Sequence, residues 1–330
     1  MPRVEYRGLV GGLNNRLAAS EIHQSEAQDL LNVDFYDRDI RQRPGYLRLN
    51  ATQDTSGLVS MGLFEFNRKD GTRKRIAKFG TRFVTFDGVG GVNTIDATLK
   101  TAVDATGQAR FASGDNRCVI ANRGDNWVYD ATTFRRVGVA APGTAPALAA
   151  GAVGNPNGAY EVKFRFRAST TGAEGPTTAE STITVTSDII AITVAAADIT
   201  ALDGYYDTVA IYISPPSDAN FYRHTTVTTA GPHNYDRTDA ALQALTKDNY
   251  SSEPIGVLTG MKSVVYLHGR AFWANDGTNP SRLYFSEVNQ PDLVLTSSFI
   301  TVDAEHHGAI TALAVLFDQV VIFKESAIYL

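Results

Sequence analysis

The residues best suited to bind a metal lie close together near the end of the chain, in the run Asp303-Ala304-Glu305-His306-His307. Adjacent residues of a strand point to opposite faces, so one strand cannot aim both histidines at one ion. The spacing also matches none of the ligand patterns of zinc sites. The sequence therefore favours a solvated turn between Val302 and Ile310, and we expect no metal site.

Catalysis by paired carboxylates is the second chemistry that the sequence could support. A glycoside hydrolase needs two carboxyl groups on either side of the scissile bond. The candidates are Asp115, Asp125, Asp130, Asp276 and Asp303. Most of them stand next to Gly or Asn, where Asp commonly stabilises turns. We therefore expect turn carboxylates rather than a catalytic pair.

Other enzyme motifs are also missing from the sequence. Gly88-Val89-Gly90-Gly91 lacks the Lys-Ser/Thr pair and the strand-helix setting of a phosphate-binding loop. The chain contains no G-x-S-x-G nucleophile motif. Its one cysteine, Cys118, cannot form an internal disulfide and is expected to be a small buried residue. We expect neither an enzyme nor a cofactor-binding protein.

The densest basic run lies in one hairpin, in which Asp70-Gly71 is a typical turn pair. Its cations are Arg68, Lys69, Arg73, Lys74 and Arg75, followed by Lys78. They could form a solvated face, contact phosphates in a lumen through which DNA passes, or contact an acidic neighbour. The formal charge of -5 excludes a generally basic, DNA-coating surface.

The elements that must position these residues are short strands. Two segments, 1–139 and 253–330, show strand patterns in groups of four, with about 40 residues to each group, which is the spacing of propeller blades. The length of 330 residues suggests two domains, and the apolar fraction of 43% is ample for packed cores. The first twelve residues hold no apolar core of signal-peptide length. No window reaches the run of about 18 apolar residues that a membrane span needs.

The middle of the chain, 140–252, differs in style. It opens with a Pro/Ala/Gly linker at 140–146, a composition typical of domain boundaries. Strand patterns follow at 160–167, 181–186, 189–194, 209–213, 221–225 and 233–236, with a turn at 171–176 and a helical turn at 239–245. So many short strands predict a β-sandwich. Tyr160 to Arg167 and the following Gly172-Ala173-Glu174-Gly175-Pro176 resemble a fibronectin type III or immunoglobulin-like module. The predicted fold is thus all-β, a propeller-like domain interrupted by an inserted sandwich.

The N-terminal segment, 1–49, carries an ordered series of short signals. Ser25 to Leu31 offers a helical turn, Asn32 to Tyr36 alternates like a strand, and Pro44-Gly45-Tyr46 is a turn. The series Gly11-Gly12-Leu13, Glu26 to Val33 (EAQDLLNV) and Arg43-Pro44-Gly45-Tyr46 resembles the N-termini of β-rich tail proteins of tailed bacteriophages. It is most similar to the nozzle proteins at the distal end of short tails.

The resemblance implies a virion structural protein, made in the host cytoplasm, that forms a ring, plausibly a hexamer, around the DNA exit channel. Its partners would be its own copies, other tail proteins such as the adaptor, fibres or spikes, and DNA in transit, without stable membrane insertion. The charged residues Glu26, Asp29, Arg41 and Arg43 would then contact a neighbour. The resemblance also leads us to expect a chain that continues past residue 330.

Two alternatives remain open from the sequence. One is a carbohydrate-binding or glycan-degrading β-protein for host attachment, although Trp127 and Trp273 are the only tryptophans that could form a stacking groove. The other is a minor tail protein of a long-tailed phage.

Overall fold

The structure is a computed structural model of the whole chain. It describes residues 59–86, 95–216, 218–248, 250 and 252–330, together with the backbone of four short N-terminal strands. The chain divides into two compact units, Met1–Ala51 and Thr52–Leu330. Each unit is described by itself below.

In the first unit, β1 (Gly12–Leu13) pairs in parallel with β2 (Glu26–Ala27), and β3 (Val33–Tyr36) pairs antiparallel with β4 (Asp39–Gln42). The strand expected at 32–36 is confirmed. The helical turn expected at 25–31 is wrong at Glu26–Ala27, because these residues pair with a distant strand, and such pairing overrides a weak local helix preference. The other residues of that segment lie outside the described residues.

The second unit contains four sheets built from consecutive antiparallel strands, which we number in chain order. Sheet 1 comprises β5 (Ser60–Asn67), β6 (Arg73–Phe79), β7 (Arg82–Phe86) and β8 (Ile95–Lys100). Sheet 2 comprises β9 (Arg110–Gly114), β10 (Arg117–Ala121), β11 (Trp127–Tyr129) and β12 (Phe134–Arg136). Sheet 3 comprises β19 (Ser263–Leu267), β20 (Arg270–Ala274), β21 (Arg282–Phe285) and β22 (Phe299–Thr301). Sheet 4 comprises β23 (Ile310–Leu316), β24 (Gln319–Lys324) and β25 (Ile328–Tyr329).

The four sheets stack face to face through shared cores. In β10, Cys118 and Ile120 join the core between sheets 1 and 2, whereas Val119 and Ala121 join the core between sheets 2 and 3. This alternation is what a strand buried on both faces requires. In β20, Trp273 belongs to the core with sheet 2, while Ala274 packs with sheet 4.

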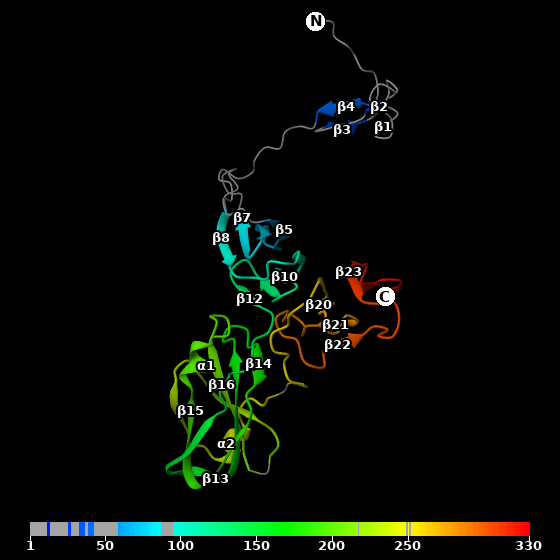
Figure 1. Cartoon of the computed structure of the whole chain (residues 1–330). Helices are drawn as coiled ribbons and strands as arrows, with labels where there is room; N and C mark the ends of the chain where they lie inside the picture. The colour runs from blue at the N-terminus through cyan, green and yellow to red at the C-terminus, as the bar shows by residue number, and fades with distance from the viewer. Residues whose placement is uncertain are drawn as a thin grey trace. The chain divides into compact units, whose positions relative to one another are not determined.

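Hydrogen bonds join neighbouring sheets as well. Ala109 N–H donates to the Met61 carbonyl, and the Asn126 side chain donates to the Leu258 carbonyl beside sheet 3. Leu313 N–H of sheet 4 donates to Ser263 Oγ of sheet 3 at 2.9 Å. The second unit is thus all-β, with small antiparallel sheets stacked like propeller blades (Figure 1). The expected fold class is confirmed.

An inserted sheet occupies the chain between sheets 2 and 3. Its hydrogen-bonded order is β17-β16-β13-β15-β18, with β14 also on β13, and it curls around one core that includes Tyr160, Phe164, Ile211 and Tyr235 (Figure 1). Its elements are β13 (Ala147–Arg167), β14 (Glu174–Thr177), β15 (Ser181–Val194), α1 (Ala196–Thr200), β16 (Thr208–Ser214), β17 (Tyr222–Val227), β18 (Gly231–Tyr235) and α2 (Asp239–Gln243).

Two local expectations for this region change, and a third is confirmed. The strands expected at 181–186 and 189–194 form the single strand β15, since both pair with the long β13. The turn expected at 171–176 gives way to β14 from Glu174. The helical turn expected at 239–245 is α2, which Thr238 caps by accepting from Ala241 N–H. Among the described residues, no helix has the length and apolar character to cross a bilayer.

The two ends of the insertion run side by side. Leu258 N–H donates to the Val137 carbonyl at 3.1 Å. Gly138, at φ +75°, lies so close to the Gly256 carbonyl that a Cβ atom would clash with it. The chain therefore leaves sheet 2 and returns to sheet 3 at nearly the same place.

This proximity leads to a first prediction. Deleting 145–251 and joining the ends with a short Gly/Ser linker should leave a folded β-protein, because the cores of the stacked sheets draw no residue from the deleted segment. Circular dichroism and a cooperative thermal transition would show this. If both the deleted protein and the isolated 145–251 segment are unfolded, the boundary is wrong.

Candidate functional site

The predicted basic hairpin is formed by β5 and β6, and carboxylates accompany several of its cations. Arg68 lies 3.0 Å from Asp70, Lys69 lies 3.1 Å from Asp115, and Arg75 lies 3.3 Å from Glu65. These pairs reduce the positive potential of the hairpin, which weakens the case for contact with DNA phosphates.

The hairpin also distributes its cations over two faces. The register opposes Glu65 to Arg75 and Phe66 to Lys74. Phe66 is fully buried in the core with sheet 2, so Lys74 lies on that inner face, whereas Arg73 and Arg75 lie on the outer face. Lys78 is buried, and its ammonium donates to the Gly107 carbonyl. Burial lowers the pKa of Lys78, and the nearby charge of Asp104 opposes this shift.

The predicted contact residues of the N-terminal segment are Glu26, Asp29, Arg41 and Arg43. Asp29 and Arg43 lie outside the described residues. Glu26 belongs to β2 and Arg41 to β4, where only the backbone is described. Their contact role stays a prediction.

Each of the five candidate carboxylates has a polar or charged partner, and for Asp130 and Asp276 partners include backbone N–H groups of the same turn. Asp130 accepts from Thr132 N–H and Thr133 N–H, and Asp276 accepts from Asn279 N–H and from the Tyr284 hydroxyl. Asp115 pairs with Lys69, Asp125 pairs with Arg136 at 3.4 Å, and Asp303 accepts from the Tyr329 hydroxyl at 2.7 Å. Such contacts are those of structural turn carboxylates.

The acidic-histidine run lies in an exposed turn between sheets 3 and 4. Asp303 Oδ1 lies 3.1 Å from His306 Nδ1, and His307 Nδ1 lies 2.9 Å from Ser326 Oγ. The ammonium of Lys324 donates to the carbonyls of Val302, Asp303 and His306 and closes the turn. Within the part of the chain that the structure describes, no group of three or more acidic, His or Cys side chains could hold a metal ion.

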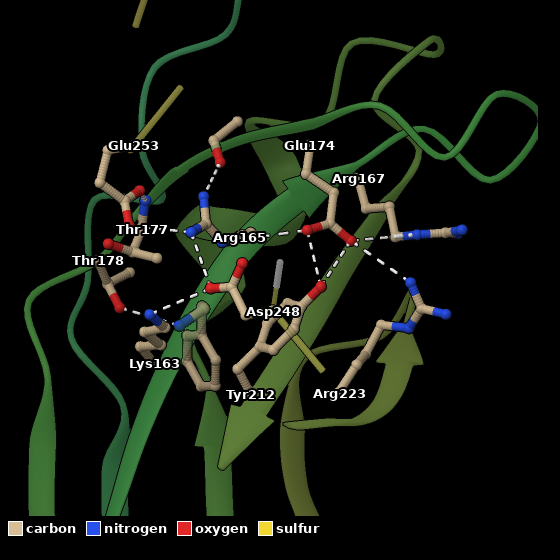
Figure 2. A network of polar contacts seen from close by, with 12 residues as sticks. Lys163, Arg165, Arg167, Glu174, Thr177, Thr178, Tyr212, Arg223, Asp248 and Glu253 are labelled. Atoms are coloured by element: carbon tan, nitrogen blue, oxygen red, sulfur yellow. Dashed lines mark hydrogen bonds and ion pairs between the residues drawn. The ribbon is translucent and has the colours of Figure 1, made fainter. Parts of the chain in front are cut away.

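A buried charge network, which the sequence did not reveal as a unit, lies where the inserted sheet meets its returning end (Figure 2). Its centre is Arg165 of β13, which is 1% exposed. Its guanidinium donates to the Gly175 carbonyl at 2.8 Å, to Asp248 Oδ2 at 2.9 Å and to Glu253 Oε1 at 2.9 Å. One arginine thereby ties β13 to both acids of the return segment.

Lys163, two residues earlier on the same face of β13, extends this contact. Its ammonium lies 3.2 Å from Asp248 Oδ2 and 3.9 Å above the centre of the Phe221 ring. The second oxygen of Glu253 accepts from Thr177 N–H at 3.2 Å. The return segment is thus fixed to two strands of the inserted sheet.

Glu174 forms the second half of the network. This buried carboxylate accepts from the Tyr212 hydroxyl at 2.7 and 2.9 Å and lies 3.3 Å from Arg167 and 3.5 Å from Arg223 (Figure 2). A cavity of about 210 Å³ opens beside it, lined also by Thr246, Lys247 and Tyr250. The network contains four cations and three anions, and each has an opposite partner, as burial demands of Lys163, Arg165, Glu174 and Asp248; Glu253 lies at its exposed edge.

Glu174 gives a pH prediction. Burial raises its pKa above the usual 4.5, and the Tyr212 hydroxyl and the neighbouring arginines only partly oppose this. A raised folded-state pKa contributes stability that is present below the unfolded pKa and is lost as the pH rises through the folded pKa. Relative to the wild type, Glu174→Gln should therefore gain stability as the pH rises from the ordinary pKa of a glutamate through the raised pKa of Glu174. Urea unfolding across that range measures the difference; a flat or opposite trend would show that the ion pairs dominate.

The cations of this network can be recognised in the sequence, but their acidic partners cannot. The strand 160–167 alternates apolar and basic residues, which places Lys163, Arg165 and Arg167 on one face. Their partners come from residues 174, 248 and 253, and only the return of the chain brings these together. The fibronectin-like pattern at 172–176 includes Glu174 but does not indicate its burial.

A larger cavity, of about 400 Å³, lies between sheet 2 and the loop before β16. It is lined by Lys100, Asp125, Trp127, Thr133, Phe134, Arg135, Arg136, Asp203, Gly204 and Tyr205. The buried Arg135 forms part of the cavity wall: it pairs with Asp130 at 2.9 Å and Asp292 at 3.5 Å and stacks 4.4 Å from the Tyr205 ring centre.

The two tryptophans that could have formed a stacking groove lie mainly in the core. Trp127 is only 5% exposed and Trp273 is fully buried.

Comparison with known proteins gives little guidance. The chain matches no protein-family model and no curated protein. Among solved structures, the AfRom2 CNH domain is 11% identical, with 85% of this chain and 83% of that chain covered and a TM-score of 0.18. Hsv2 of Kluyveromyces lactis is 9% identical, with 80% of this chain but only 58% of that chain covered and a TM-score of 0.21. These values assign the chain to no family.

Proposed function

We propose that this chain is a structural protein of a bacteriophage tail, which forms a ring around the DNA exit channel and takes part in tail assembly and genome delivery. The observation that carries the proposal is the ordered N-terminal series Gly11-Gly12-Leu13, EAQDLLNV at 26–33 and Arg43-Pro44-Gly45-Tyr46. The stacked sheets with an inserted sheet support it, because a rigid all-β body suits a structural part.

The buried network gives this proposal a physical basis. Arg165, Glu174, Asp248 and Glu253 hold the inserted sheet to the segment that returns to sheet 3. An insertion fixed by buried charges at its base transmits force rather than swinging freely, since breaking such a pair is costly. The structural role therefore uses the buried charges without any reaction.

Antibody labelling tests the proposal directly. Gold-labelled antibody against this chain should decorate the distal tail of virions in electron micrographs. Label along a long tail would favour the minor-tail-protein alternative, and particles that carry no label in a preparation containing the chain would contradict the proposal.

Sugar binding is the second candidate, and the 400 Å³ cavity is the observation that favours it, since Asp125, Arg136 and Tyr205 could contact hydroxyl groups. The burial of Trp127 and Trp273 removes the exposed stacking rings typical of such sites. Saturation-transfer NMR with host surface polysaccharide distinguishes the candidates, because a ring protein should give no transfer.

The N-terminal segment gives a further prediction. Changing Arg41 and Arg43 to Glu should yield a folded protein that no longer enters tails, because each copy in a ring repeats the altered contact. A single exposed charge pair is worth about 0–1 kcal/mol. Immunoblots of purified tails measure incorporation, with Arg237→Glu, at an exposed site between β18 and α2, as the control. Normal incorporation would limit this segment to a role within its own subunit.

A further inference from the structure

A cavity of about 210 Å³ lies between the inserted sheet and the return segment that follows α2. The sheet lines it with Glu174 of β14, Tyr212 of β16 and Arg223 of β17, and the return segment lines it with residues 246–248 and Tyr250. Pockets for drug-sized ligands occupy about 300–1,000 Å³. This cavity is smaller, so its size suits one small charged group.

Positive charge exceeds negative charge around this cavity. The cations of the network and of the cavity lining are Lys163, Arg165, Arg167, Arg223 and Lys247. The acids are Glu174, Asp248 and Glu253. Asp207, whose oxygens accept from Ser169, also interacts electrostatically with Arg167. The cations outnumber the acids even with Asp207 included, and a buried charge without a counter-charge is costly.

The imbalance is greatest at Glu174. Its Oε1 lies 3.3 Å from Arg167 and 3.5 Å from Arg223, and its Oε2 lies 4.0 Å from Arg165. Figure 2 shows Arg167 and Arg223 on one side of this carboxylate and Arg165 on the other. The Tyr212 hydroxyl donates to the same two oxygens. One negative charge is thus shared by three guanidinium groups.

Arg165 pairs with further acids, whereas Arg167 and Arg223 share Glu174. Arg165 binds both acids of the return segment, each at 2.9 Å. Among the described residues, Arg167 and Arg223 form ion pairs with Glu174 alone. Their side chains are 19% and 26% exposed, so a ligand from solvent can reach them.

Arg167 and Lys247 add to the positive charge that Arg223 brings to the cavity. Gly172 lines the cavity, and a Cβ atom on it would lie 3.5 Å from Arg167 Nη2, so this guanidinium lies at the cavity edge. Lys247 is exposed, lines the cavity and has no ion pair within the described part of the chain. Arg223 belongs to the inserted sheet and Lys247 to the return segment. A ligand that contacts both would join the two.

We propose that this cavity binds a small oxyanion, a phosphate or carboxylate group, through Arg223, Lys247 and Arg167. Arginine suits such a group because its parallel N–H donors can meet two oxygens at once. The bound anion supplies the negative charge that the network lacks and links the inserted sheet to the return segment. The site does not depend on the proposed ring and adds a ligand at the base of the insertion.

Isothermal titration calorimetry on the whole 330-residue chain tests the site. Sodium phosphate and sodium glucuronate are the two probes, and glucose is the neutral control. At least one of the anions should bind saturably at one site per chain, whereas glucose should not bind. Arg223→Gln should weaken binding by about tenfold, which corresponds to one charge-assisted hydrogen bond. Lys247→Gln, at an exposed residue, should weaken it by about threefold.

Glu174→Gln separates a ligand site from a purely structural network. The substitution removes the carboxylate that competes with the ligand for the guanidinium groups of Arg167 and Arg223. Anion binding should therefore tighten by about tenfold or more. Weaker binding in this variant would overturn the proposal, because the anion would then not share these guanidinium groups.

The basic hairpin of sheet 1 provides the matched control. Arg73→Gln removes an exposed arginine from that hairpin and should bind the anion like the wild type. Equal weakening in Arg73→Gln and Arg223→Gln would place the anion elsewhere and overturn the site. Circular dichroism shows whether each variant is folded, and the exposed Lys247→Gln keeps the test valid if Arg223→Gln does not fold.

The two probes also identify the source of the oxyanion. Binding of phosphate alone supports a phosphate ester as the ligand, and binding of glucuronate alone supports an acidic sugar. No saturable binding of either anion at tens of millimolar would overturn the proposal. Binding that Arg223→Gln and Lys247→Gln both leave unchanged would overturn it as well. The ring proposal is judged separately, by labelling of virions.

Discussion

Replacing Arg165 by Met should lower the free energy of unfolding by about 3–5 kcal/mol, which is the cost of removing one partner from a buried ion pair. The guanidinium is 1% exposed and bridges Asp248 and Glu253, each at 2.9 Å. Without it, Asp248 keeps only its ion pair with Lys163 among the residues that the structure describes, and the Gly175 carbonyl loses its side-chain donor. Chemical unfolding followed by circular dichroism measures the loss.

A compensated variant separates lost charge balance from lost packing. Adding Lys163→Met, Asp248→Asn and Glu253→Gln to Arg165→Met should recover a large part of the stability, because the contact with the return segment then holds neither an unpaired acid nor an unpaired Lys163. Arg237→Met, at an exposed arginine in the connection between β18 and α2, should change stability by about 0.5 kcal/mol or less. Equal effects at Arg165 and Arg237 would mean that the network contributes little to folding.

Replacing Trp273 by Ala should cost a similar amount, about 3–5 kcal/mol. The indole is fully buried in the core between sheets 2 and 3, with Val128, Met261 and Tyr284 around it. Its removal opens a cavity at the centre of the stack, where rigid strands on both sides limit collapse. The expected result is a lower midpoint of chemical unfolding.

A conservative change at the same position serves as the reference. Trp273→Phe should cost clearly less than Trp273→Ala, because most of the apolar volume remains. Val153→Ala, at a residue that is 85% exposed, should be nearly neutral. If Trp273→Ala were as mild as Val153→Ala, the shared core would not be what joins sheets 2 and 3.

The burial of Trp273 can be predicted from the sequence, whereas the burial of Arg165 cannot. Trp273 lies in the uninterrupted apolar run Ala271 to Ala274, so its burial follows from local composition. The burial of Arg165 does not follow from the local sequence, because the basic face of an alternating strand usually lies in solvent. Such a face becomes buried only when carboxylates from distant parts of the chain pack against it. The same holds for Lys78 and Lys324, which the sequence suggests as surface cations but which donate to backbone carbonyls inside the fold.

The sequence by itself determined the all-β class, most strand positions, the turn at Asp70-Gly71 and the buried Cys118, because alternation and turn chemistry are local properties. It did not predict the first part of β13, at 147–159, and it split β15 in two. Only the tertiary structure decided which sheets stack and which cations are buried. Those features depend on contacts between residues far apart in the chain, and no local pattern specifies the partner of a strand face or of a charge.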